Sequence, residues 1–208
     1  MTVDFRRQWL PRSGPPDSSQ GRLYFRAPDR VLVEVRTPIH QIMEVEGQHL
    51  RIYYPDRRKA FDLIAPGPQD LPFFETYLCA LNEDFGLAGQ GYKAAGHEMH
   101  GDTLVSRWEP PFLLQKALGP LSLATRRGHL AWVELTTPKG RCMLRHQCVT
   151  SKVVGSYTYP TRMETQVLIG RVPGTERVDY DNPVANVPLP AWVLGFHLPA
   201  DAEVRELR

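Results

Sequence analysis

Cysteine is scarce in this chain. The 208 residues include three cysteines, too few for a disulfide framework and without the spacing of a zinc site. Cys142 and Cys148 share parity on a predicted strand, but at ~3.3 Å per residue they would lie about 20 Å apart. A disulfide between them is an alternative only if the chain bends, so we expect free or buried thiols at both positions and at Cys79.

Long apolar runs are also missing. No stretch of about 18 apolar residues exists, so no transmembrane helix is predicted. The first residues, MTVDFRRQWLP, have no apolar core segment and are not expected to act as a secretory signal. Two alternatives stay open: a cytosolic protein, or the mature form of an exported protein with a start methionine added.

The chain has no excess of charge of one sign. Its net charge is +2 and its basic residues are scattered, so no nucleic-acid partner is expected. Two short basic runs, at 57–59 and 126–127, fall at predicted turns. We interpret them as solvated hairpin tips rather than as a site for an anionic ligand.

Catalytic and phosphate-binding motifs are absent from the sequence. It has no G-x-S-x-G, no H-E-x-x-H, no phosphate-binding glycine loop and no dinucleotide fingerprint. His97 and His100 look like a metal pair, but on a strand positions three apart point to opposite faces. We therefore expect no enzyme activity, no metal and no cofactor.

The chain is rich in proline, and its apolar and polar residues alternate. Its 19 prolines are spread evenly, a rhythm that interrupts helices but suits strands joined by turns. Glycine-containing turns support the same division. The predicted strands are 3–10, at least four within 21–63, and then 91–100, 103–109, 121–126, 129–137, 142–154 and 157–169.

The stretch 21–63 organises the rest of the sequence. Leu23 and Phe25 and then the valines of 31–35 fall on one parity, whereas most charged residues fall on the other. Leu50, Ile52 and Tyr54 repeat the pattern. A period of two places the apolar set on one face of a meander of antiparallel strands.

One clear helix is predicted after the prolines of 66–68. Its apolar stripe is Leu71, Phe74, Leu78, Leu81 and Phe85, spaced by three and four residues. The residue before the stripe, at 70, can cap the helix, and the glycine at 86 can end it. The helix either packs on a core or lies across the apolar face of the sheet, and both alternatives predict the same stripe.

Two proline-rich segments complete the chain. Residues 110–120 are expected to form a short second helix or a flap. The tail from 180 onward is expected to pack over an existing surface by isolated apolar anchors, namely Val187, Leu189, Trp192, Phe196 and Leu198.

These elements predict a mainly β (α+β) fold in a single domain, 1–208. We expect an unclosed antiparallel β-barrel of about 10–11 strands with a helical lid over an apolar concave face. Such an interior is either filled by side chains or left as a cavity that suits an acyl chain. The expected cavity residues are Leu23, Phe25, Val31, Val33, Val35, Met43, Leu50, Ile52, Leu63, Phe74, Leu78, Leu81, Phe85, Trp108 and Trp132.

The chain contains a series of short motifs, which in chain order are F-x-x-Q, G-x-L-x-F-x-x-P-D-R, P and G-x-x-L-x-x-Y-x-P. This series resembles the LolA/LolB-like superfamily of periplasmic lipoprotein carriers. Two later segments, YTYPTRM at 157–163 and FHLPADAEV at 196–204, also resemble this family. The matching positions are Phe5, Gln8, Gly21, Leu23, Phe25, Pro28, Asp29, Arg30, Pro38, Gly47, Leu50, Tyr53 and Pro55.

The resemblance implies a carrier or chaperone without catalysis or cofactor. It would take the acyl chains of lipoproteins, or another lipid, from inner-membrane release machinery to an outer-membrane acceptor in the periplasm. A monomer is expected. The alternative is an envelope sensor or scaffold domain of the same fold, which binds lipid or a protein partner without transporting it.

Two departures point to a divergent member. An arginine that helps to hold the lid of LolA precedes the proline of the second strand, but Ala27 occupies this position here. Arg26 lies one residue earlier, on the opposite face, and is the candidate polar residue at a lid or entrance. The family also usually has an amphipathic helix before the first strand, whereas this sequence starts almost at that strand.

Overall fold

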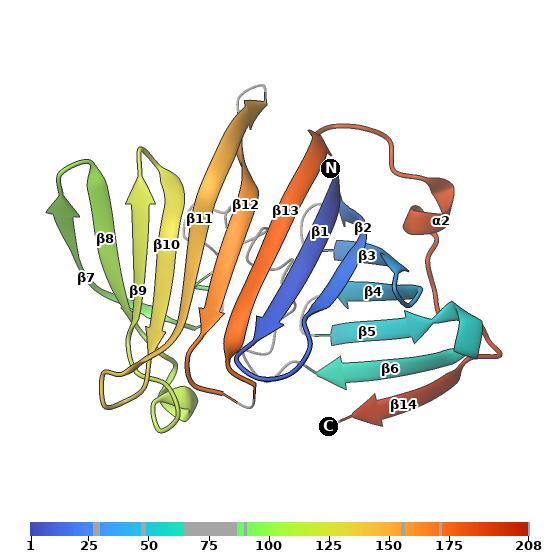
Figure 1. Cartoon of the computed structure of the whole chain (residues 1–208), viewed down its shortest axis with the longest axis horizontal. Helices are drawn as coiled ribbons and strands as arrows, with labels where there is room; N and C mark the ends of the chain where they lie inside the picture. The colour runs from blue at the N-terminus through green and yellow to red at the C-terminus, as the bar shows by residue number, and fades with distance from the viewer. Residues whose placement is uncertain are drawn as a thin grey trace. The chain divides into compact units, whose positions relative to one another are not determined.

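The structure is a computed structural model that describes residues 1–26, 30–46, 49–64, 87–89, 91–154, 157–170 and 172–207. Hydrogen bonds join 14 strands in the order β14-β6-β5-β4-β3-β2-β1-β13-β12-β11-β10-β9-β8-β7. The two end strands, β14 and β7, do not pair with each other, so the sheet is unclosed (Figure 1). The predicted unclosed, mainly β fold is confirmed, but the expected number of strands was too low.

The strands and short helices have the following bounds: β1 (Thr2–Pro11), β2 (Asp17–Arg26), β3 (Arg30–Thr37), β4 (Gln41–Glu46), β5 (His49–Tyr54), η1 (Pro55–Arg57), β6 (Lys59–Ile64), β7 (Lys93–His100), β8 (Thr103–Glu109), η3 (Phe112–Leu114), β9 (Leu121–Arg126), β10 (His129–Thr136), β11 (Cys142–Val154), β12 (Tyr157–Val167), β13 (Gly174–Val184), α2 (Ala191–Leu194) and β14 (Glu203–Leu207).

The chain divides into two compact units. Unit 1 comprises Met1–Arg7, Ser18–Leu71 and Tyr180–Arg208, and unit 2 comprises Gln8–Asp17 and Pro72–Asp179. β1 and β13 contribute residues to both units. Because strands are shared between the units, the organisation of residues 1–208 as a single domain stays a prediction.

Unit 1 is built on the meander β2 to β6, as the alternation in the sequence predicts. Each strand pairs antiparallel with the next, and β14 is added in parallel to the free edge of β6 (Figure 1). β3 is buried on both faces: Val31, Val33 and Val35 on one side and Leu32 on the other are at most 2% exposed. The middle of this strand is therefore a continuous apolar run rather than an alternating one.

The start of the meander depends on one glycine. A Cβ atom on Gly21 would lie 1.9 Å from the carbonyl oxygen of Glu34, far inside van der Waals contact. The register between β2 and β3 shifts at the same place, between Gln20 and Gly21. Only glycine allows the two backbones to approach this closely.

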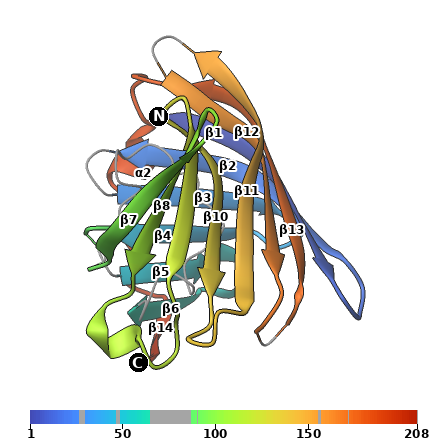
Figure 2. The ribbon, with the colours of Figure 1, turned by 90° about the vertical axis from the view of Figure 1, so that its left-hand side faces the viewer.

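Unit 2 contains a second meander, β7 to β12, whose strands lie side by side in Figure 2. Its strands at 103–109, 121–126 and 142–154 confirm the predicted bounds. Gly101, Gly128 and Gly140, in the turns between strands, all have positive φ, which glycine adopts at no steric cost.

Four segments complete the comparison with the sequence interpretation: two strands that it missed, the segment 110–120, and a predicted helix that lies outside the described residues. β13 and β14 were not predicted. The segment 110–120 contains only the short 3₁₀ turn η3, whose Phe112 and Leu113 are 84% and 87% exposed. The predicted lid helix from 70 to 86, with Phe74, Leu78, Leu81 and Phe85, lies outside the described residues.

Candidate functional site

One face of unit 1 carries a straight row of apolar side chains. Leu23, Val33, Met43, Ile52 and Phe61 are successive cross-strand partners from β2 to β6. Residues directly opposite each other on antiparallel strands project from the same side of the sheet. The five side chains therefore form one continuous apolar band across five strands.

A second row runs parallel to the first, two residues along each strand. It consists of Phe25, Val31, Val45, Leu50 and Leu63. Since successive pairs on one face are two residues apart, the two rows together form a wide apolar face. We call the ten residues of these rows the unit 1 apolar face.

The burial of this face is uneven. Leu23 and Val33 are completely buried, and Met43 is 7% exposed. Ile52 and Phe61, at the other end of the same row, are only half-buried. This first row is thus covered over β2 and β3 and partly accessible at Ile52 and Phe61.

Unit 2 has an apolar face of its own. One row across β8 to β12 consists of Trp108, Leu121, Leu135, Leu144 and Val167. All five side chains are buried or half-buried. This row therefore forms an apolar band comparable to the one in unit 1.

The neighbouring row of unit 2 is not uniformly apolar. It consists of Ser106, Leu123, Val133, His146 and Thr165, again as successive cross-strand partners. We call these five residues the mixed row. Three of the five positions in the mixed row are thus polar, and they interrupt an otherwise apolar face.

His146 is the most unusual member of the mixed row. It is 4% exposed, and its Nδ1 lies 2.6 Å from Oγ1 of Thr165. Its other ring nitrogen, Nε2, is buried and has no hydrogen-bond partner. Burial lowers the pKa of His146 from 6.5 to about 4, because desolvation disfavours the charged imidazolium. The ring is therefore neutral near pH 7.

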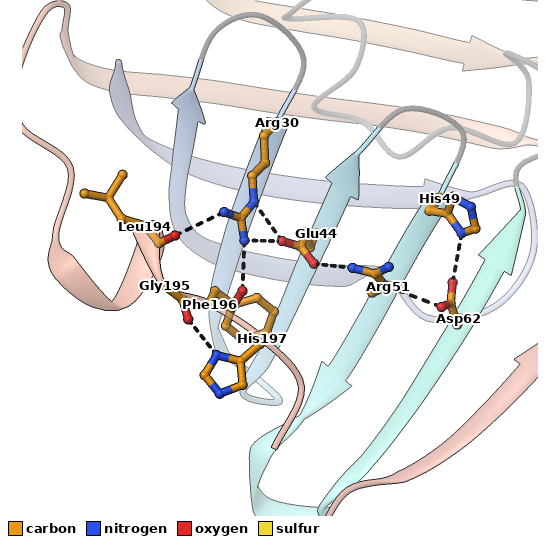
Figure 3. Close-up of polar contacts among 9 residues, drawn as sticks. All are labelled: Arg30, Glu44, His49, Arg51, Asp62, Leu194, Gly195, Phe196 and His197. Atoms are coloured by element: carbon orange, nitrogen blue, oxygen red, sulfur yellow. Dashed lines mark hydrogen bonds and ion pairs between the residues drawn. The ribbon is translucent and has the colours of Figure 1, made fainter. Parts of the chain in front are cut away.

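The opposite face of unit 1 holds a connected set of charged side chains (Figure 3). Glu44 is 2% exposed and accepts hydrogen bonds from Nε of Arg30 at 2.8 Å and from Nη1 of Arg51 at 3.2 Å. Arg51 also bonds to Asp62, at 3.4 Å. Both oxygens of the buried Glu44 carboxylate have a cationic partner, so its burial is fully compensated.

Arg30 also ties the C-terminal segment to this face. Its guanidinium donates to the carbonyl oxygens of Leu194 at 3.2 Å and Phe196 at 2.9 Å (Figure 3). Beside these bonds, Val193 packs with Tyr24 and Leu32 in a buried cluster. The tail therefore packs over an existing surface, and the predicted anchors Leu189 and Phe196 contact the cluster while Trp192 lies edge-on against Tyr24.

Comparison with known proteins gives matches in structure and none in sequence: no family model and no curated protein matches. A LolA superfamily protein of Nitrosomonas europaea has a TM-score of 0.60 at 12% identity, over 90% of this chain and 86% of that chain. A DUF1329 family protein of Desulfovibrio piger has a TM-score of 0.65 at 13% identity, over 92% and 88%. A domain named for outer-membrane lipoprotein sorting, from Vibrio parahaemolyticus, has a TM-score of 0.60 at 12% identity, over 87% and 83%.

The chain has the LolA-superfamily fold. The resemblance seen in the sequence is thereby confirmed for the fold. The matches cover most of each chain, so the likeness extends across the strands rather than to one motif.

Within this LolA-like fold, the predicted cavity residues that the structure describes fall into three sets. Those on the unit 1 apolar face are Leu23, Phe25, Val31, Val33, Met43, Leu50, Ile52 and Leu63, with Val35 on the same parity of β3. Trp108 lies on the apolar face of unit 2. Trp132 does not: it pairs with Gln147 and is adjacent to Val133 in β10, so it projects from the other side of the sheet.

Arg26 lies on the face opposite Leu23 and Phe25, as its parity predicts. It is exposed and lines a shallow recess of about 10 Å³, together with Tyr24, Arg30 and Leu189. That volume holds about one water molecule. The role of Arg26 at a lid or entrance, and the role of the apolar residues as a ligand cavity, stay predictions.

The described part of the chain contains no cluster of three or more potential metal ligands and no helix long and apolar enough to cross a membrane. Cys142 and Cys148 are both free, and burial raises the pKa of each thiol. They do not form the disulfide that was left open as an alternative.

Two features of the LolA-like fold escaped sequence reasoning, the Glu44 network and the buried His146. Only His146 had a usable signal, because it shares the parity of Leu144 and is thus a polar residue at a predicted apolar position. Glu44 lies between Met43 and Val45, where alternation already predicts a residue of the polar face. Its burial and its partners depend on contacts that the local pattern does not show.

Proposed function

We propose that this protein is a periplasmic carrier or chaperone that binds the acyl chains of lipoproteins, or another lipid, and delivers them toward the outer membrane. The LolA-superfamily fold supports this function. The observation that carries it is the unit 1 apolar face, which continues unbroken over five strands and is partly accessible at Ile52 and Phe61. It acts by binding and release, without catalysis.

The energy of such binding is large even for partial coverage of the ligand. Each methylene removed from water contributes ~0.8 kcal/mol. Burying ten methylenes would contribute about 8 kcal/mol, before the cost of ordering the ligand is subtracted. A lipoprotein anchor carries more methylenes than this, so a partly open apolar face is sufficient to hold it in solution.

The direct test is to mix the protein with a purified triacylated lipoprotein in detergent-free buffer. We expect a soluble complex of one protein to one lipoprotein in size-exclusion chromatography with light scattering. The same lipoprotein produced without its acyl chains is the control and should not bind. Failure of the acylated form to give a soluble complex would contradict the proposal.

A matched pair of isoleucines tests where the acyl chains bind. Ile52→Glu places a charge on the unit 1 apolar face, and we expect it to weaken complex formation by at least about tenfold, because the carboxylate must be buried or must exclude the ligand. Ile39→Glu introduces the same change at a residue that is 46% exposed and should leave binding unchanged. Equal binding by both variants would mean that the chains bind elsewhere.

Delivery is tested separately from binding. The loaded complex is mixed with vesicles that contain either inner-membrane release machinery or an outer-membrane acceptor, and movement of labelled lipoprotein is followed. A carrier should accept cargo from the first and release it to the second. Binding without release, together with tight binding to a membrane-protein partner, would favour the sensor or scaffold function instead.

A further inference from the structure

We propose that His146 and Thr165 form a polar anchor that hydrogen-bonds the ester group of a bound acyl lipid on the apolar face of unit 2. The proposal rests on the lipid-binding function above, concerns a second surface besides the unit 1 apolar face, and specifies the chemistry of the ligand that binds there. It assigns an ester-linked lipid, rather than a bare hydrocarbon or an anionic head group, to this face.

The position of His146 places a buried polar atom beside an apolar row. On one side the imidazole pairs across the strands with Val133, and the parallel row that begins at Trp108 carries only apolar side chains. Both neighbours in the mixed row, Val133 and Thr165, are half-buried, whereas His146 is buried. A ligand over this row would therefore meet apolar side chains interrupted by the polar members of the mixed row, of which His146 is the buried one.

The hydrogen bonding of His146 is half complete. A neutral imidazole has one donor and one acceptor nitrogen. Thr165 Oγ1, at 2.6 Å, satisfies Nδ1, whereas buried Nε2 has no partner. Buried polar atoms in folded proteins are nearly always paired, and an apolar residue at this position would avoid the cost. The unpartnered Nε2 is the atom that a ligand would satisfy.

The chemistry around His146 favours a neutral acceptor. When the Thr165 hydroxyl donates to Nδ1, the proton of the ring is on Nε2, which can donate to a carbonyl oxygen. Burial keeps the imidazole neutral, so it offers no positive charge to a phosphate or carboxylate. Glu176, the next residue across from Thr165 on β13, adds a negative group on the same side of the sheet. An ester carbonyl within an acyl lipid fits these conditions.

The test compares two lipids with the same chains. The first is a dipalmitoylglyceryl-cysteine peptide, with ester links; the second is its dihexadecyl analogue, which has ether links and no ester carbonyl. We expect the wild-type protein to bind the ester on the order of tenfold more tightly, the effect of one buried hydrogen bond. His146→Leu should lose this preference, whereas His97→Leu, at an exposed histidine of β7, should keep it.

The outcomes separate the two proposals. If neither lipid binds to the wild-type protein, both the lipid-binding function and the anchor are wrong. If both lipids bind equally well, or if His146→Leu keeps the preference for the ester, the anchor alone is wrong.

A second measurement reports on the imidazole itself. In ¹⁵N-resolved NMR, we expect the Nε2 proton of His146 to shift downfield when the ester lipid is added and not when the ether lipid is added. An unchanged signal with bound ester would overturn the anchor even if the His146→Leu variant fails to fold.

Discussion

Glu44 in unit 1 and His146 in unit 2 are both buried titratable residues on strands, but they differ in how far their polar atoms are satisfied. Glu44 has a cationic partner on each carboxylate oxygen, whereas His146 has a partner on only one ring nitrogen. A fully paired group fixes the structure around it. A half-paired group keeps one polar atom that can hydrogen-bond a ligand. This difference assigns a structural role to Glu44 and a binding role to His146.

The largest effect on the unfolding free energy should come from disrupting Glu44, the fully paired residue. Glu44→Gln removes the charge between Arg30 and Arg51 and should lower the unfolding free energy by about 3 kcal/mol, because a buried ion pair that loses one partner leaves the others uncompensated. Denaturant unfolding measures this. The matched control is Glu134→Gln, which disrupts the more exposed pair with Arg145 and should cost less than about 1 kcal/mol. Similar losses of unfolding free energy in both variants would contradict the structural role of Glu44.

A pH titration tests the burial of His146. The pKa of the folded state, about 4, lies below the ordinary 6.5, so on acidification the unfolded chain takes up the proton first. The contribution of His146 to stability is therefore fully present above pH 6.5, declines as the pH falls toward 4, and is constant below. The full difference is roughly 3 kcal/mol. We expect His146→Leu to remove this part of the acid destabilisation of the wild-type protein, and parallel pH profiles would contradict it.

The smallest of the three effects concerns the bond that His146 does make. Thr165→Val leaves both ring nitrogens unpaired and should lower the unfolding free energy by about 1–2 kcal/mol. In a His146→Leu background, the same substitution should be close to neutral. A double-mutant cycle measures this coupling. Additive losses would show that Thr165 acts independently of the imidazole.

The sequence predicted the local structure well where side-chain alternation was clear. In β2 and β3 the period of two identified the apolar face, and the turn glycines marked the limits of β8, β9 and β11. β13 was missed because Arg177, Asp179, Asp181 and Pro183 give it the composition of a loop. Its charges are tolerated because they face solvent and pair across the strands, as Asp179 does with Arg162 at 2.6 Å.

The prediction of which side chains share a face agrees with the strand pairing throughout unit 1 and less completely on unit 2, and the use of these residues as a binding site stays a prediction. The alternation placed Leu23, Val33 and Ile52 on one face because the pairing of the strands that carry them is regular from Gly21 onward. Trp132 was expected on the apolar side, but the register of β10 shifts between Leu130 and Trp132. A bulge adds one residue to a strand and turns the following side chains to the other face. No feature of the local sequence predicts this bulge.

Strand periodicity and turn chemistry are local properties, so the amino-acid sequence was enough to predict antiparallel strands with apolar faces. Which distant groups meet depends on the tertiary structure. The parallel pairing of β14 with β6 joins residues about 140 positions apart, and Arg30 reaches carbonyl groups at 194 and 196. The tertiary structure also decided that Glu44 is satisfied and His146 is not, because hydrogen-bond partners depend on neighbours in space rather than on neighbours in the chain.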